Sequence, residues 1–151
     1  MFLVPPTKIT HMAAETIFEK IIAGEVPARI VHETETTAAF LDANPLAAGH
    51  TLVVPKEPYE RLNDLPDELA ADVFETVHEL TPRIEQAVEA DGTTIGINNG
   101  TVAGQEVPHV HVHIVARFEG DGGGPIHAIA PETPALSDAE LDEIEAAITS
   151  R

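Results

Sequence analysis

The sequence predicts an α+β protein, with helices packed on a five-stranded antiparallel sheet. Three observations lead to this fold class. Five short β-prone runs lie between turn residues, and one long segment, 66–90, keeps apolar side chains at helical spacing. The chain also lacks the repeated strand–helix–strand units that build a parallel sheet. At 151 residues, it has the length of one domain with a substantial core.

The N-terminal half is expected to form a short helix and three strands. Residues 1–11 carry two prolines and no periodicity, so we expect a poorly ordered extension followed by a single domain over 12–151. The segment 16–22 gathers its apolar residues on one side and meets Gly24, which is typical of a short helix. The expected strands are 28–32, 36–41 and 51–54, the last of them ended by Pro55.

The C-terminal half is expected to hold the long helix, two strands and a final helix. The apolar residues of the long helix recur at steps of three and four: Leu69, Val73, Val77, Leu80, Ile84 and Val88. Strands are expected at 94–98 and 109–117, with a loop at 99–104 between them. Ser137, with Glu140 three residues later, predicts a capping box that opens the C-terminal helix. The apolar stripe of that helix comprises Leu141, Ile144 and Ile148.

The charge balance limits the possible partners. There are 26 Asp and Glu against 8 Lys and Arg, a formal net charge of −18. Such a field repels nucleic acid and anionic lipid, so neither is expected as a partner. The acidic residues are dispersed along the chain, and only three basic residues are lysines. Dispersed acid with scarce lysine is typical of proteins adapted to a salt-rich cytoplasm, so we expect a halophilic source; an ordinary acidic mesophilic protein is the alternative.

Several kinds of site are excluded by what the sequence lacks. With no cysteine, the chain has no disulfide, thiolate metal site or cysteine nucleophile. No apolar run approaches the roughly 20 residues that span a bilayer. The opening apolar stretch meets two prolines too soon for a signal peptide. We therefore expect a cytoplasmic protein with no membrane partner.

Three histidines alternate with apolar residues in the segment 109–115. In a strand, alternate side chains share a face, so His109, His111 and His113 are expected on one face. Val110, Val112 and Ile114 are then expected to face the core. Three imidazoles in a row cost stability in an ordinary sheet, because each needs hydrogen-bond partners and protonated neighbours repel. The row therefore indicates a functional site.

Two chemistries use such a row. One is metal ligation, in which His-x-His supplies two ligands. The other is phosphoryl or nucleotidyl transfer, in which one imidazole attacks phosphorus and its neighbours orient it or donate to oxygen. The surroundings favour phosphate, because the loop before the histidines has Gly100 and Gly104, which let backbone N–H groups turn toward an anion.

On these residues, the sequence resembles the histidine-triad (HIT) family of nucleotide-binding proteins, and within it the general prokaryotic branch. Residues 109–115 fill the family signature, in which three histidines are separated by single apolar residues and followed by two further apolar residues. Residues 49–56 are similar to a second marker of the family, and residues 16–28 to its start. The resemblance covers nearly all of residues 15–118.

The resemblance implies a HIT-like fold and a homodimer in which two five-stranded sheets join, with a purine nucleotide bound in each subunit. It makes His111 the nucleophile that becomes nucleotidylated and places His113 at the phosphate and leaving group. His109 and His50 support and orient the site. The implied substrate contacts are Asp42 for the ribose hydroxyls, Asn98 and the backbone of Gly104 and Gln105 for phosphate, and Ile17, Phe18, Ile21 and Phe40 for the base. A plain core role for Ile21 is equally open.

The sequence departs from the family pattern at three places. Glu106 stands where many members carry a Ser or Thr that contacts phosphate or the leaving group, and an ionised Glu cannot donate that bond. Thr16 and Glu19 stand near the place of the cysteines of zinc-containing members, so that structural zinc is expected to be absent. The chain has no Trp, and so lacks the Trp-Pro-Pro-Gly tail of the phosphoramidase branch.

The resemblance implies a hydrolase or transferase that acts at the α-phosphate of purine nucleotide conjugates such as phosphoramidates and adenylylated amines. The reaction is expected to pass through a covalent nucleotidyl-histidine and to need no cofactor. Hydrolysis of dinucleoside polyphosphates is the alternative within this class. A nucleotide-binding adaptor with vestigial turnover and a mononuclear metal enzyme are the alternatives from other classes.

Overall fold

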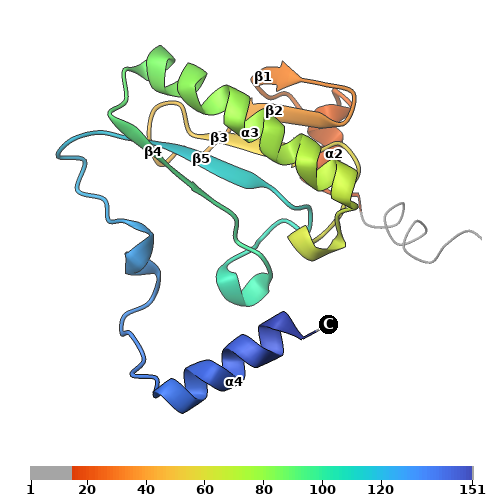
Figure 1. Cartoon of the computed structure of the whole chain (residues 1–151). Coiled ribbons are helices and arrows are strands. Elements are labelled where there is room, and N and C mark those ends of the chain that lie inside the picture. Colours follow the sequence, from red (N-terminus) through yellow and green to blue (C-terminus); the bar gives the residue numbers. More distant parts are fainter. Residues whose placement is uncertain (1–14, 151) are drawn as a thin grey trace, which may run out of the picture.

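The computed structural model describes residues 15–150, so the expected extension at 1–11 lies outside the described residues. Within them, three α-helices accompany a five-stranded antiparallel sheet of strand order β1-β2-β3-β5-β4, which confirms the predicted fold class (Figure 1). The strands are β1 (Ile30–Glu33), β2 (Thr37–Leu41), β3 (Thr51–Pro55), β4 (Gly92–Gly96) and β5 (Val112–Arg117). The helices are α2 (Ile17–Ile22), α3 (Asp67–Val88) and α4 (Asp138–Thr149), with short 3-10 turns at Leu62–Asp64, Thr101–Ala103 and Ile126–Ile129.

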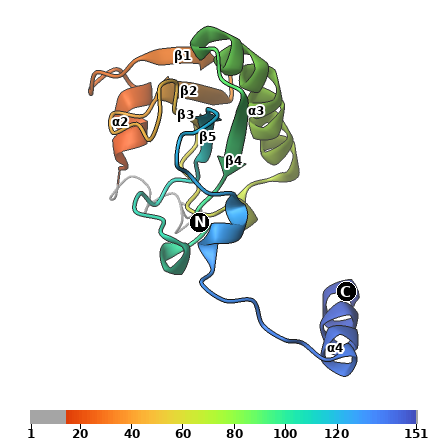
Figure 2. The same ribbon diagram turned by 90° about the vertical axis from the view of Figure 1, so that its left-hand side faces the viewer.

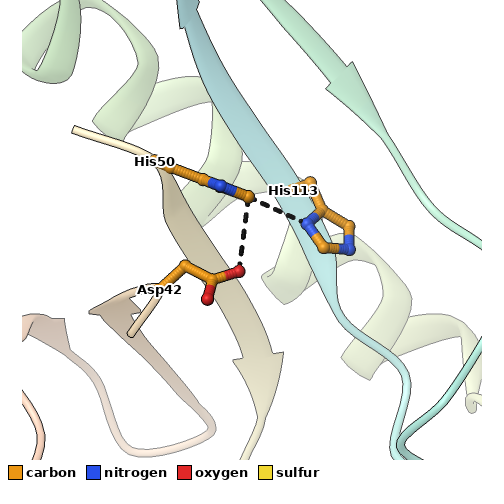
Figure 3. A group of neighbouring side chains, drawn as sticks. All are labelled: Asp42, His50 and His113. Carbon is orange, nitrogen blue, oxygen red and sulfur yellow. Dashed lines mark hydrogen bonds and ion pairs between the residues drawn. The ribbon is translucent and has the colours of Figure 1, made fainter. Parts of the chain in front are cut away.

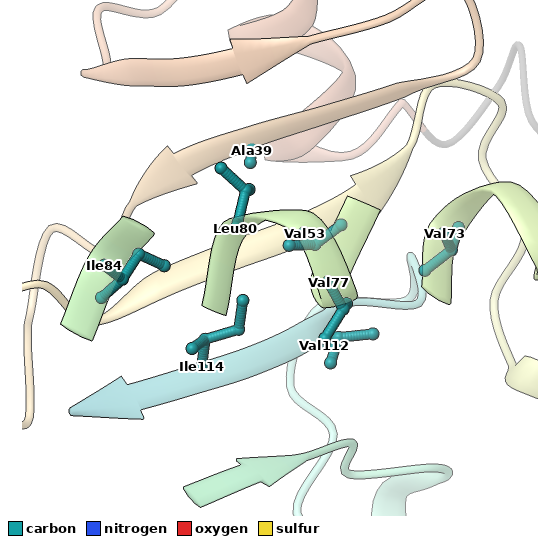
Figure 4. Packing of buried hydrophobic residues seen from close by; sticks show 8 residues of the cluster. All are labelled: Ala39, Val53, Val73, Val77, Leu80, Ile84, Val112 and Ile114. Atoms are coloured by element: carbon teal, nitrogen blue, oxygen red, sulfur yellow. The ribbon is translucent and has the colours of Figure 1, made fainter. Parts of the chain in front are cut away.

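The two faces of the sheet are covered by different helices, which lie on opposite sides of it in Figure 2. On one face, α3 packs its apolar stripe onto β2, β3 and β5. The buried residues of this cluster are Ala39, Val53, Val73, Val77, Leu80, Ile84, Val112 and Ile114 (Figure 4). On the other face, α2 contributes Phe18 and Ile21 to a second cluster with Phe40 and Leu52. Because both faces are covered, β2 and β3 are buried along nearly their whole length.

The last strand begins at Val112, three residues later than the sequence predicts. Its ladder with β3 ends at the Val53–Val112 pair. Beyond that pair, the backbone N–H of Val110 donates to the carbonyl of Tyr59 at 2.7 Å. The carbonyl of Pro55 accepts from the ring of His109 instead of from a strand N–H. His109 and His111 therefore lie just before the strand, and side-chain bonds hold them where ladder bonds are absent.

Other boundaries differ by one or two residues. β4 spans Gly92–Gly96 in place of 94–98, because its ladder with β5 starts at the Gly92–Arg117 pair. β1 is shifted to Ile30–Glu33, and β3 runs through Pro55, which needs no donor at the end of a strand. Helix α3 ends at Val88, where Glu89 takes a left-handed conformation. No helix among residues 15–150 is long and apolar enough to cross a membrane.

The C-terminal helix α4 forms as predicted, with Ser137 and Glu140 completing its capping box. It lies apart from the sheet, at the end of an extended connection that follows β5 (Figures 1 and 2). Its apolar stripe is exposed, with 45% of the surface of Ile144 and 76% of that of Ile148 accessible. The sequence predicts the stripe correctly, but within one chain that stripe is not buried.

Candidate active site

The three histidines of the row share one face, as predicted, and face the side of the sheet that α2 covers. The ring of Phe18 lies edge-on to His111, with ring centroids 4.9 Å apart, and also contacts His109 at 5.5 Å. Val112 and Ile114 point the opposite way, into the core beneath α3. Alternation across the chain thus continues through His109 and His111, although the ladder does not include them.

His109 is fully buried and anchored at both ring nitrogens. Its Nε2 lies 2.8 Å from the carbonyl oxygen of Pro55, and its Nδ1 lies 2.9 Å from the hydroxyl of Thr16. A carbonyl oxygen can only accept, so Nε2 carries the hydrogen and Nδ1 accepts from Thr16. The two bonds therefore hold His109 in one ring orientation, with the hydrogen of Nε2 directed at the Pro55 carbonyl.

His111 is oriented by the backbone of the residue two places before it. Its Nδ1 lies 2.8 Å from the carbonyl oxygen of His109, and the ring is buried. Because that oxygen accepts, Nδ1 carries the hydrogen and Nε2 keeps an unshared electron pair. Burial lowers the pKa of His111, although the His109 carbonyl and the charge of Asp42 oppose the effect. At neutral pH, His111 is a neutral imidazole whose Nε2 keeps its unshared electron pair.

His50 and His113 form a second pair, beside Asp42 (Figure 3). The N–H of Leu46 donates to Nδ1 of His50 at 3.0 Å, so the hydrogen of His50 resides on Nε2. That Nε2 lies 3.0 Å from Nδ1 of His113 and 3.6 Å from a carboxylate oxygen of Asp42. His113 must then carry its own hydrogen on Nε2, which is buried and has no hydrogen-bond partner within residues 15–150. An N–H donor is thus left for a bound molecule.

The pKa values of this pair keep it neutral. Burial, together with the neighbouring rings of His111 and His50, lowers the pKa of His113 to about 4, against the opposing charge of Asp42. Burial also lowers the pKa of His50, with Asp42 opposing. The site is therefore a set of uncharged imidazoles beside one carboxylate.

Asp42, His50 and His113 also have the composition of a metal site, because their candidate ligand atoms lie within 4.8 Å of one another. Spacing in the sequence does not reveal this group, because Asp42 follows β2 and lies far along the chain from the three histidines. A metal would need the Nε2 lone pair of His50, but the Leu46 N–H places the hydrogen of His50 on that nitrogen. The observed hydrogen bonds therefore fit a proton relay better than a metal centre.

The loop at 99–104, before the three histidines, has backbone N–H groups that bond within the loop. The N–H of Gly104 donates to Thr101 at 3.0 Å and that of Gln105 to Gly100 at 3.1 Å. The Gln105 side chain is buried, accepting from the N–H of Gly100 and donating to the carbonyl of Glu60. The two backbone N–H groups expected at the phosphate are thus engaged in the loop, and Gln105 shapes that loop. Asn98 and Glu106 are exposed beside it.

The expected base-binding residues divide between core and surface. Phe18, Ile21 and Phe40 are buried in the cluster beneath α2, whereas Ile17 is 43% exposed. The core interpretation of Ile21 thus agrees with its burial. Sequence reasoning noted Thr16 only as a substitute for a zinc ligand and missed its bond to His109. The preference of Thr for a helix N-cap was the one available signal.

Comparison with known proteins identifies the family. The sequence profile of the HIT domain matches residues 23–120. The chain belongs to the HIT family. A HIT-like protein of Methanocaldococcus jannaschii is 52% identical over 106 residues, covering 70% of this chain and 81% of the relative. The crystal structure of a HIT family member from Bacillus subtilis superposes with a TM-score of 0.79 at 37% identity, covering 89% of this chain and 95% of that one.

Other relatives carry names that state an activity. An adenosine 5'-monophosphoramidase of Saccharomyces cerevisiae is 38% identical over 110 residues, covering 73% of this chain and 67% of the relative. An asymmetrical bis(5'-nucleosyl)-tetraphosphatase of Schizosaccharomyces pombe is 37% identical, and this HIT chain spans 59% of its length. An adenylylsulfatase of Arabidopsis thaliana is 36% identical, and the chain spans 54% of its length.

Proposed function

We propose that this HIT protein hydrolyses conjugates of purine nucleoside monophosphates at the α-phosphorus, with phosphoramidates and adenylylated amines as the substrate class. One observation carries the proposal: the His109 carbonyl fixes the hydrogen of His111 on Nδ1 and leaves Nε2 as a buried, neutral nucleophile. The names of relatives such as the yeast adenosine 5'-monophosphoramidase support the substrate class.

In the first step, the Nε2 lone pair of His111 forms a bond to the α-phosphorus. The bond from phosphorus to the leaving group breaks at the same time, and the leaving group takes its electron pair. Covalent catalysis of this kind divides one difficult displacement into two easier ones. The product of this step is a nucleotidyl-His111 and a leaving group that needs a proton.

When the substrate binds, its phosphate anion and Asp42 favour uptake of one proton from solvent by the His113 ring. The protonated ring then gives its Nε2 proton to the leaving group and is left neutral. In the second step, water attacks phosphorus and gives a proton to Nε2 of His113, and the bond to His111 breaks. The nucleoside monophosphate is released, the proton taken up on binding returns to solvent, and both rings regain their starting state, so the atoms balance as a hydrolysis.

The remaining residues are assigned to substrate binding. Asp42 retains acceptor capacity for ribose hydroxyls, since one of its oxygens accepts from the N–H of Asn44 and the other faces His50. Exposed Ile17, beside buried Phe18, offers an apolar wall for a base. Asn98 provides an exposed amide donor for phosphate at the start of the glycine loop.

We propose further that two copies of the chain join their sheets through β4. This edge strand pairs with β5 in a regular register over all five of its residues. The opposite edge, β1, has a register shift between Ile30 and His32, and such irregularities block edge pairing. Exposed Ile95 on β4 and the stripe of α4 supply apolar surface for the contact.

The decisive experiment is covalent trapping on His111. Adenosine 5'-phosphoramidate, a dinucleoside tetraphosphate and adenylyl sulfate are each mixed with the protein in molar salt. The reaction is quenched at neutral or basic pH, because phosphorus–imidazole bonds are acid-labile, and intact mass is measured. We expect an added nucleotidyl mass and turnover with the phosphoramidate. His111→Ala should abolish the adduct and lower turnover by orders of magnitude, while nucleotide binding persists.

Two controls sharpen this test. His113→Ala should slow turnover less than His111→Ala, because it removes a proton donor and not the bond-forming atom. Treatment with EDTA should leave turnover unchanged. An adduct on another residue, or normal turnover by His111→Ala, contradicts the mechanism. Faster turnover of the tetraphosphate than of the phosphoramidate favours dinucleoside polyphosphate hydrolysis. Nucleotide binding without turnover favours a nucleotide-binding adaptor.

A further inference from the structure

The nucleophile of the proposed reaction lies outside the regular strand. The ladder between β3 and β5 ends at Val112, so no strand bond fixes the peptide groups at 109–111. The carbonyl of His109 must nevertheless hold its direction within a narrow range, because it sets which nitrogen of His111 carries the hydrogen. Since the ladder does not do this, bonds outside it have to keep His109 in place, among them the ring bond to Pro55 of β3 and the Val110–Tyr59 bond.

Thr16 provides a buried hydrogen bond that can do this. Its hydroxyl lies 2.9 Å from Nδ1 of His109, across 93 residues of sequence, and Thr16 itself is 7% exposed. The His109 ring has its hydrogen on Nε2, facing Pro55, so the Thr16 hydroxyl is the donor to Nδ1. The same oxygen accepts from the N–H of Glu19, which uses its acceptor capacity without competing for its hydrogen.

We propose that Thr16 is a positioning residue for catalysis, which clamps the His109 ring from the N-terminus of α2 and thereby holds the His109 carbonyl on Nδ1 of His111. This inference rests on the proposed nucleophilic role of His111. The Thr16–His109 bond also links helix α2 to the histidines, which Phe18 of the same helix contacts. Thr16 is the N-cap of the helix that carries Phe18, and Phe18 packs edge-on against both His109 and His111. One side chain thus couples the position of α2 to the tautomer of the nucleophile.

The test compares Thr16→Val, which keeps the shape but has no hydroxyl, with Thr16→Ser, which restores it. For Thr16→Val, we expect kcat with adenosine 5'-phosphoramidate to fall by roughly tenfold to a hundredfold, as small misplacements of catalytic groups do. KM should change little, because Thr16 is buried and is not among the proposed substrate contacts. Thr16→Ser should keep kcat near that of the wild-type protein.

A matched control separates positioning from helix capping. Glu19 completes the capping box of α2 by accepting from the N–H of Thr16, and both of its bonds in that box are with Thr16. Glu19→Ala should weaken the cap but leave kcat close to the wild-type value. An equal loss of kcat in Glu19→Ala and Thr16→Val would reduce Thr16 to a structural cap and overturn the proposal. An unchanged kcat in Thr16→Val would also overturn it, because the Val110–Tyr59 bond would then suffice to hold the peptide.

A second readout does not depend on turnover. Long-range proton–nitrogen NMR of the imidazole rings reports which nitrogen carries the hydrogen. The wild-type protein should show His111 as the Nδ1–H tautomer, and Thr16→Val should show it mixed with the Nε2–H form. If the wild-type protein turns over no phosphoramidate but the tautomer shift occurs, the proposed function fails and the clamp stands. If Thr16→Val leaves the His111 tautomer unmixed, the clamp fails whatever the activity.

Discussion

Three histidines of the site have their proton placed by a backbone group, and the fourth, His113, has it placed by His50. The Pro55 carbonyl selects the Nε2–H form of His109, and the His109 carbonyl selects the Nδ1–H form of His111. The Leu46 N–H selects the Nε2–H form of His50, which in turn sets His113. A nitrogen with an unshared electron pair and a donor N–H are therefore present before any substrate binds. Preorganisation of this kind avoids a cost at the moment of reaction.

Burial of neutral imidazoles predicts that acid lowers stability. Folding lowers the pKa values of His50, His111 and His113, the last to about 4, whereas unfolded histidines titrate near 6.5. Between these values the unfolded chain binds more protons, so the free energy of unfolding falls as pH decreases through this window. At about pH 5.5, His113 alone accounts for roughly 1 kcal/mol of the loss.

Urea unfolding at pH 7.0 and about pH 5.5, in constant molar salt, measures this effect. His113→Gln should flatten the dependence, whereas His127→Gln, a change at an exposed histidine, serves as the control. Equal free energies of unfolding at the two pH values would show that the imidazoles are not held neutral.

At the level of residues, the alternation of side chains along the sequence correctly predicted which neighbouring residues share a face. Alternation placed the row on one face and Val112 and Ile114 in the core, and the structure confirms this. Pairings across the fold were not accessible. The resemblance groups His50 with His109, but the structure pairs His50 with His113, 63 residues away. The partnership of Thr16 with His109 spans still more sequence. Such contacts follow from strand order and register, which periodicity does not encode.

Among the elements, α4 shows how far a sequence pattern reaches. Its cap and stripe follow from local spacing, and both form as predicted. What covers the stripe depends on surfaces that are far away in sequence or in another chain.

In β5, the apolar pattern and the hydrogen-bonded strand have different bounds. Apolar alternation continues through Val110, which is buried, although the ladder starts only at Val112. Burial sets the pattern, while hydrogen bonding sets the boundary.

The two edges of the sheet lead to a prediction about assembly. Sedimentation at micromolar concentration in molar salt should show a homodimer, because β4 offers a regular edge and exposed apolar surface. Ile95→Lys should yield monomers by placing a charge at that edge. Ile30→Lys is the matched control, since Ile30 is similarly exposed on the bulged edge strand β1. A monomeric wild-type protein, or dissociation by Ile30→Lys alone, contradicts the proposed β4 interface.

For the whole molecule, charge is the dominant feature outside the core. Eight Lys and Arg can neutralise at most eight of the 26 acidic residues, so at least 18 lack a cationic partner of this kind. Ion pairs in the described structure include Lys56 with Glu33 and Arg117 with Asp121. Both are at the surface, where such pairs add little stability. The fold therefore has to tolerate a large repulsion.

That repulsion leads to the prediction that stability depends on salt. The screening length is about 3 Å at 1 M salt and about 10 Å at 0.1 M, so dilution lets neighbouring carboxylates repel one another. Because the folded chain holds these charges closer together than the unfolded chain does, its stability should fall on dilution. The melting temperature, measured by calorimetry in KCl from the molar to the millimolar range, should decrease steadily. Sucrose in place of KCl should not restore it, because a neutral solute screens no charge.

Replacing exposed acids on α3, as in Glu68→Gln with Glu75→Gln, should reduce the slope of melting temperature against KCl concentration. A melting temperature that is the same at both ends of the range would remove the case for adaptation to salt.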